Sequence, residues 1–114
     1  MIAVVFEVVL TDDGKSEYLQ IAAGLKERLA DIPGFISIER FQSLIDPGKI
    51  LSLSFWEAEE AVEKWRNLEE HRIAQARGRS KLFREYRIRV GSIVRDYTLT
   101  DREGAPHDSR RVHG

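Results

Sequence analysis

The hydrophobic periodicity of the chain switches several times between about two and about 3.6 residues, and the order of these switches restricts the fold. Helical spacing of apolar residues begins at Ser16, ends at Pro33-Gly34, and returns after Glu57. Alternating apolar residues, which are typical of strands, fill four segments: 2–10, 35–44, 50–56 and 86–97. The order strand, helix, strand, strand, helix, strand predicts the split βαβ arrangement of a ferredoxin-like α+β fold.

Turn residues separate the predicted elements. Thr11-Asp12-Asp13-Gly14 ends the first strand, and Asp46-Pro47-Gly48 joins the two middle strands so tightly that we expect an antiparallel hairpin. In the second helical region, Asn67 is followed three residues later by Glu70, the pattern of a helix N-cap with its reciprocal carboxylate. We therefore predict one helix over 57–65 and a separate one from Leu68 to Arg77, closed by Gly78.

The first strand is apolar on both faces, which has a consequence for assembly. Its two faces carry Ile2, Val4, Phe6 and Val8 on one side and Ala3, Val5 and Val9 on the other. Two helices cover only one face of an antiparallel sheet, and a face in contact with water is normally polar. We expect the second face to pack on another subunit in a homodimer, with an interface of roughly 2,000 Å² or more.

Composition removes several classes of function. The 114 residues contain no Cys, which excludes thiolate catalysis and Cys-based metal sites. The chain has no glycine-rich phosphate loop, no GxSxG or HExxH motif and no calcium-binding spacing. It also lacks an apolar run of about 18 residues and a basic leader before its first strand, so we expect a cytoplasmic protein without a membrane partner.

The formal net charge of −1 conceals an uneven distribution. Residues 1–63 carry 5 basic and 12 acidic side chains, whereas 64–89 carry 9 and 3. This split favours contacts within or between subunits, or an anionic ligand near the basic segment, over nucleic acid. The basic segment includes Arg72, Arg84, Arg87 and Arg89, and an ion-paired or solvated face is the alternative explanation.

The predicted domain covers residues 1–98, and residues 99–114 form a polar C-terminal tail that we expect to be flexible. His107 and His113 lie in this tail without a neighbouring metal-ligand pattern, so we expect no metal there. Glu7 interrupts an otherwise apolar strand. It is expected to pair with an arginine of the last strand, and the alternative is a buried acid in a pocket.

Two sequence motifs resemble one protein family. The run Ser54-Phe55-Trp56-Glu57-Ala58-Glu59-Glu60-Ala61 leads to Trp65, and Glu70-His71-Arg72 is followed by Gly78-Arg79. With the strand order, these motifs resemble the antibiotic biosynthesis monooxygenase family over about residues 1–98. The resemblance implies a dimeric α+β barrel built from ferredoxin-like subunits. Members of the family include cofactor-free oxygenases, heme-degrading enzymes and proteins without a known reaction.

The cofactor-free oxygenases of this family imply a specific site. Trp65 matches their pocket Trp, His71 stands where they have a Tyr, and Ala61 replaces their Asn. By this resemblance the chain is a cofactor-independent monooxygenase of a phenol-type or quinol-type aromatic molecule. His71 is then the candidate base, Trp65 and Phe6 are the walls of the substrate site, and Arg72 steers a phenolate. His71 and Trp65 share a pocket only if the helix breaks near Asn67.

Less specific interpretations stay open beside this one. Trp65 also fits a core position, and His71 fits a solvent-exposed or structural position. With these roles the protein would be a non-catalytic dimeric binding or interaction module. The heme-degrading members imply a third function. However, this chain has Phe6 and Glu7 where their first strand has an Asn, and Ala74 and Gln75 where they have an iron ligand.

Overall fold

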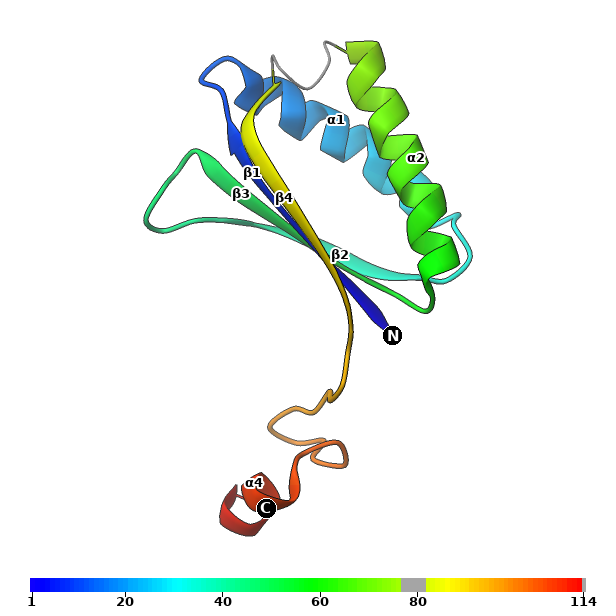
Figure 1. The fold of residues 1–114 in the computed structure, drawn as a ribbon, viewed down its shortest axis with the longest axis vertical. Helices are drawn as coiled ribbons and strands as arrows, with labels where there is room; N and C mark the ends of the chain where they lie inside the picture. The colour runs from blue at the N-terminus through cyan, green and yellow to red at the C-terminus, as the bar shows by residue number, and fades with distance from the viewer. Residues whose placement is uncertain (77–81, 114) are drawn as a thin grey trace.

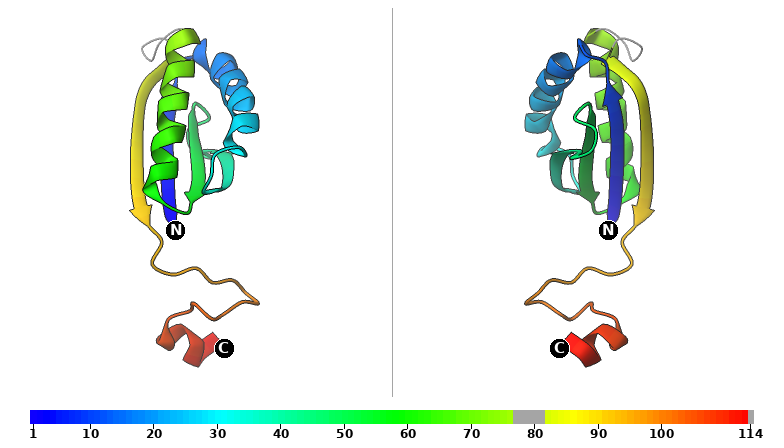
Figure 2. Two further views of the ribbon diagram at one scale, coloured as in Figure 1. Left: turned by 90° about the vertical axis from the view of Figure 1, so that its right-hand side faces the viewer. Right: turned by 90° about the vertical axis from the view of Figure 1, so that its left-hand side faces the viewer.

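A single antiparallel sheet carries two long helices on one of its faces. The computed structural model describes residues 1–76 and 82–113. Its elements are β1 (Ile2–Leu10), α1 (Gly14–Leu29), β2 (Phe35–Gln42), β3 (Lys49–Trp56), α2 (Glu59–Ala76), β4 (Phe83–Ser92) and α4 (His107–His113). The strand order is β2-β3-β1-β4, and α1 and α2 lie side by side over the same face (Figures 1 and 2). The predicted ferredoxin-like α+β fold is confirmed.

Strand β3 turns its small polar side chains, rather than its large apolar ones, toward the helices. Ser52 and Ser54 are buried, whereas Leu51, Leu53 and Phe55 lie half-buried on the opposite face of the sheet. Pairing with β1 fixes this orientation, because Ser52 lies opposite Phe6, which is buried beneath the helices. Side chains directly opposite each other in an antiparallel pair share a face.

The hydrophobic core beneath the helices forms two clusters. One surrounds the start of α1 and consists of Phe6, Val8, Leu10, Tyr18, Ile50, Leu82 and Phe83. The other lies under the start of α2 and consists of Leu29, Trp56, Ala61, Val62 and Trp65. On β3, Ile50 belongs to the first cluster and Trp56 to the second, and the two serines lie between them. The small serines therefore mark the place where the core is interrupted.

The uncovered face of the sheet is apolar along much of β1 and β3 and charged along β4, where Glu85, Arg87 and Arg89 lie opposite Val9, Glu7 and Val5. The apolar residues Ala3, Val5, Val9, Leu51, Leu53 and Phe55 lie there. Glu7 also lies on this face, and its carboxylate approaches Arg89 of β4 at 3.6 Å and Lys49 of β3 at 3.7 Å. The predicted pairing of Glu7 with an arginine of the last strand is confirmed.

The structure corrects the predicted break in the second helical region. Helix α2 runs from Glu59 to Ala76 through Asn67 without interruption. The apolar and acidic side chains around Asn67 continue the helical stripe, so tertiary packing of α2 on the sheet outweighs the local capping pattern. The predicted stop at Gly78 lies outside the described residues.

The last strand is also displaced from its predicted bounds of 86–97. Strand β4 begins at Phe83 and ends at Ser92, because its partner β1 extends only from Leu10 to Ile2 in the opposite direction. Backbone hydrogen bonding continues for one further residue, where the Ile93 N–H donates to the Met1 carbonyl at 2.9 Å.

Beyond β4 the chain leaves the body of the domain and ends in α4 (Figure 1). Helix α4 is not expected from the sequence, since Val112 is its only large apolar residue. Arg102 organises this segment: its guanidinium lies 5.0 Å from the centroid of the Tyr97 ring and donates to the Ser109 hydroxyl at 2.9 Å. Within the described ranges, no helix combines the length and apolar character needed to span a membrane.

The start of α1 is packed closely against the residue that precedes β4. The Thr11 N–H donates to the Leu82 carbonyl at 3.0 Å, and Leu82 is fully buried. A Cβ atom at Gly14 would lie 2.6 Å from the Leu82 carbonyl oxygen and 2.9 Å from its Cα. Both are backbone atoms, so this contact cannot be relieved by turning a side chain.

We predict opposite effects for two glycine substitutions in α1. Gly14→Ala should lower the free energy of unfolding by about 1–3 kcal/mol, because the backbone must move to admit the methyl group. Gly24→Ala is the matched control: a Cβ atom there meets nothing within 4 Å. It should raise stability by about 0.5–1 kcal/mol through helix propensity. Urea unfolding measures both, and equal effects would contradict the close packing at Gly14.

Tyr18 of α1 brings a hydroxyl group into the core. Its side chain is 3% exposed, and its ring packs edge-on against Phe83 at 5.6 Å. Burial raises the pKa of Tyr18, the Glu69 carboxylate raises it further, and Arg40 opposes the rise. Arg40 lies near, but neither the Tyr18 hydroxyl nor Arg40 Nε has a hydrogen bond of ordinary geometry.

This environment predicts a loss of stability at alkaline pH. The raised pKa keeps Tyr18 protonated in the folded state above pH 10, where the unfolded chain loses the proton, so stability falls as pH rises. Tyr18→Phe should flatten this decline and, at pH 7, leave stability unchanged or raise it by up to about 1 kcal/mol. The control is Tyr97→Phe, because the Tyr97 side chain is 39% exposed. This variant should lose stability with rising pH as the wild type does, measured by urea unfolding between pH 8 and 11. An unchanged slope in Tyr18→Phe would contradict this prediction.

Candidate functional site

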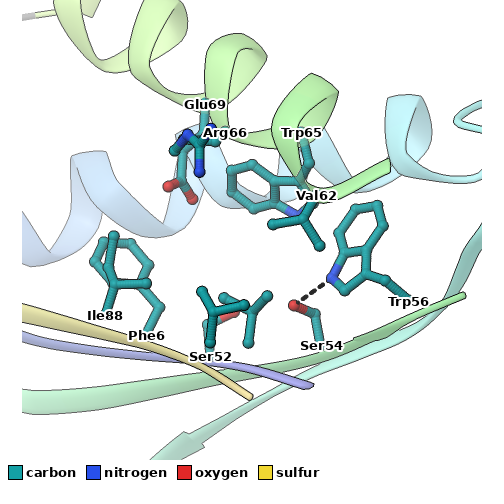
Figure 3. A pocket seen from close by; sticks show the side chains of 11 residues that line it. Phe6, Ser52, Ser54, Trp56, Val62, Trp65, Arg66, Glu69 and Ile88 are labelled. Atoms are coloured by element: carbon teal, nitrogen blue, oxygen red, sulfur yellow. Dashed lines mark hydrogen bonds between the residues drawn. The ribbon is translucent and has the colours of Figure 1, made fainter. Parts of the chain in front are cut away.

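A pocket lies between α2 and the sheet, at the interruption between the two core clusters. Its cavity volume is about 50 Å³, enough for a few water molecules. Figure 3 shows the side chains of α2 above it and those of the sheet below. The lining consists of Val4, Phe6, Ser52, Ser54, Trp56, Val62, Trp65, Arg66, Glu69, Ile88 and Val90.

The spacing of the sequence explains why these residues meet. The α2 residues in the lining are 62, 65, 66 and 69, which form one stripe along the helix. On the sheet side, Ser52 and Ser54 of β3 face this stripe beside apolar side chains of β1, with those of β4 beyond. Because a serine fills much less space than leucine or phenylalanine, the sheet leaves room beneath the helix at this point.

Trp56 is fixed at one end of the pocket. It is fully buried, and its indole N–H donates to the Ser54 hydroxyl at 2.9 Å. The Phe35 ring packs edge-on against it at a centroid distance of 5.2 Å. This indole is therefore a rigid wall, whose only donor is already satisfied by Ser54.

The other end of the pocket is charged. Glu69 is half-buried and Arg66 is exposed, and both project from α2 beside the apolar walls (Figure 3). Glu69 and Arg40 act in opposite directions on the pKa of Tyr18, so both charges lie near this buried hydroxyl. Arg40 is opposite Ser52 in the β2–β3 pairing, which places it on the helix-covered face. An apolar cavity with a carboxylate at one end can bind a small apolar molecule and exchange a proton with it.

The structure brings together only some of the residues predicted from sequence. Phe6 and Trp65 both line the pocket. Arg72 instead lines a separate surface hollow between α2 and α1, with Ile21 and Arg28. His71 lies on α2, but its side chain is outside the described part of the chain. Helix α2 has no break near Asn67, the feature on which the sequence prediction of a shared pocket for Trp65 and His71 depended.

Most of the described arginines of the basic segment do not converge on this pocket. Arg89 pairs with Glu7 on the uncovered face, and Arg84 lies 3.7 Å from Asp12. Arg87 lies opposite Glu7 in the β1–β4 pairing and therefore also on the uncovered face. Of this segment, the described pocket lining includes only Arg66 as a cation.

Glu69, Ser52 and Ser54 are among the lining residues that sequence reasoning did not select. Glu69 carried a usable signal, because it lies four residues after Trp65 and thus on the same helix face. The serines carried none, since alternation within β3 leaves open which face meets the helices. In the described residues there is also no group of three His, Cys, Asp or Glu side chains that could hold a metal ion.

Comparisons with known proteins identify the family to which the chain belongs. Residues 1–77 match the family model for antibiotic biosynthesis monooxygenase. The chain is 43% identical over 94 residues to a protein of Pyricularia oryzae named jasmonate monooxygenase ABM. The match covers 82% of this chain but only 44% of that protein.

Solved structures are similar in fold. Rv0793 of Mycobacterium tuberculosis superposes with a TM-score of 0.72 at 15% identity, over 85% of this chain and 98% of that one. A MhuD variant with manganese protoporphyrin IX bound has a TM-score of 0.66 at 15% identity, over 86% and 99%. Together with the family match, these findings show that the chain belongs to the antibiotic biosynthesis monooxygenase family.

Proposed function

We propose that this protein is a monooxygenase that acts on a small, mainly apolar organic molecule in the pocket beneath α2. The observation that carries the proposal is a cavity with apolar and aromatic walls and a carboxylate at one end. Family membership and the Pyricularia relative named as a monooxygenase support the same reaction class. Fold alone would not suffice for this assignment.

The finer substrate assignment is a phenol-type or quinol-type aromatic molecule. Once deprotonated, such a ring is electron-rich enough to react with dioxygen and itself supplies the two electrons that reduce the second oxygen atom to water. The protein must then supply a base and a pocket that excludes water. Phe6 and Trp65 would be walls of this pocket. The name of the Pyricularia relative makes jasmonate-type compounds the second class to examine. We propose no tightly bound cofactor.

A ring-sized substrate requires the pocket to open. The present cavity of about 50 Å³ is smaller than a six-membered aromatic ring needs with its substituents. Arg66 of α2 and Ile88 of β4 line the cavity and are exposed, so these side chains border it on the solvent side. We propose that substrate enters by displacing them.

Two other functions have less support from the pocket. Heme iron is held in proteins by His, Cys, Met or Tyr. The described lining offers none of these side chains, since α2 contributes Val62, Trp65, Arg66 and Glu69. A non-catalytic binding module would use the same apolar walls, and it differs from an enzyme in leaving its ligand unchanged.

Oxygen uptake tests the proposed function. The protein should accelerate dioxygen consumption with at least one compound from a panel of phenols, quinols, anthrones and jasmonic acid. Trp65→Ala should reduce kcat/KM by about tenfold or more, because substrate orientation depends on the pocket walls. Leu19→Ala, at an exposed position of α1, is the control. His71→Ala in the same assay tests the predicted base.

No uptake above the uncatalysed rate with any compound would overturn the oxygenase proposal and favour a binding module. An active Trp65→Ala variant with unchanged kcat/KM would move the reaction away from this pocket. An unchanged His71→Ala variant would remove His71 as the base while leaving the reaction class intact.

We also propose that the uncovered sheet face packs on a second copy of the chain in a homodimer. The apolar side chains on this face, with Leu53 and Val5 directly paired at its centre, need cover from water. The Glu7 carboxylate is paired with Arg89 and Lys49, which lowers the cost of burying that carboxylate between two such faces. In the family this assembly is a dimeric α+β barrel.

A charge placed on this face should dissociate the dimer. Leu53→Asp is expected to give a monomer in sedimentation velocity runs at micromolar concentration, where the wild type is a dimer. Leu19→Asp introduces the same charge at an exposed leucine of α1 and should stay dimeric. Circular dichroism checks that both variants are folded. A monomeric wild-type protein would contradict the proposed assembly.

A further inference from the structure

We infer that Glu69 is the acid-base group of the pocket, and that its carboxylate accepts the proton that a bound substrate releases. This inference rests on the proposed function and names Glu69, in place of the sequence-predicted His71, as the residue that performs its first step. Glu69 would be a catalytic residue in the strict sense, because the proton passes directly between it and the substrate.

The position of Glu69 supports this role. It is one helical turn beyond Trp65 on α2 and lines the same cavity as Phe6 and Ser52. Figure 3 shows its carboxylate pointing from the helix toward the sheet side chains. A carboxylate at the end of an otherwise apolar cavity is the group there that can take a proton from a bound O–H.

Glu69 lies close to other charged and titratable side chains. The Glu69 carboxylate and the Arg40 guanidinium act in opposite directions on the pKa of Tyr18, so both lie near this buried hydroxyl. Arg66, three residues before Glu69 on α2, lines the same pocket. The groups placed near Glu69 by these observations are therefore Tyr18 on α1, Arg40 on β2 and Arg66 on α2.

The proposed step is a single proton transfer. The O–H bond of the substrate breaks, its electron pair stays on the oxygen, and the proton forms a new O–H bond on Glu69. The negative charge moves from Glu69 to the substrate, and Arg66 is a cation of the same pocket lining. Dioxygen enters only after this step, so the transfer needs no oxidant.

A phenol whose ionisation is visible tests this inference without turnover. The probe is 4-nitrophenol, since its phenolate absorbs at longer wavelength than the neutral phenol. In the wild-type protein, Glu69 takes the proton of bound 4-nitrophenol, so the phenolate absorbance should appear at lower pH than for the free compound. In Glu69→Gln no carboxylate is there to take the proton, so bound 4-nitrophenol should ionise no more readily than the free compound. The two ionisation constants should differ by about tenfold or more.

The matched control is Glu63→Gln, which removes an exposed carboxylate from the same helix outside the pocket. It should titrate bound 4-nitrophenol as the wild type does. The inference is overturned if Glu69→Gln and wild type give the same ionisation constant, or if the wild type binds no 4-nitrophenol. Since the oxygen-uptake panel includes compounds other than phenols, a failure here leaves the reaction class separately testable.

Discussion

The register between β1 and β3 is the constraint on which the rest of the structure depends. It places Ser52 opposite Phe6 and Ser54 opposite Val4, on the face that the helices cover. Two small polar residues therefore lie at the centre of the covered face, between the bulky Ile50 and Trp56. A shift of one residue would bring Leu51 and Leu53 beneath α2 and fill the pocket.

The same register determines the character of the other face. With its serines directed toward the helices, β3 presents Leu51, Leu53 and Phe55 on the uncovered side, next to Val5 and its neighbours. The pocket and the proposed dimer interface thus have one origin. A chain whose β3 pointed the other way would have a filled core and a polar outer face, and neither the proposed reaction nor the proposed assembly would follow.

The fold could be predicted from sequence because its elements are short, strongly periodic and separated by clear turns. The continuity of α2 through Asn67 could not be predicted from the sequence. The capping pattern at Asn67 is local, whereas the continuity of α2 depends on burial of Val62 and Trp65 against the sheet.

The candidate site could be predicted only in part, for a related reason. Phe6 and Trp65 could be predicted from the sequence because apolar residues on an amphipathic pattern point toward the core. The serines beneath them depend on strand pairing between segments more than forty residues apart, which alternation alone does not specify. Glu69 lies on the same helical stripe as Trp65, but this relation follows only when α2 is one continuous helix.

The proposed reaction transfers one oxygen atom from dioxygen to a substrate in this pocket. Its most direct test is product mass after reaction under oxygen-18 gas, with the compound that gives the fastest oxygen uptake. The account predicts incorporation of one heavy oxygen atom by the wild-type protein, at a rate that falls when Trp65 is replaced by alanine. A product without the isotope, or incorporation that is independent of Trp65, would contradict it.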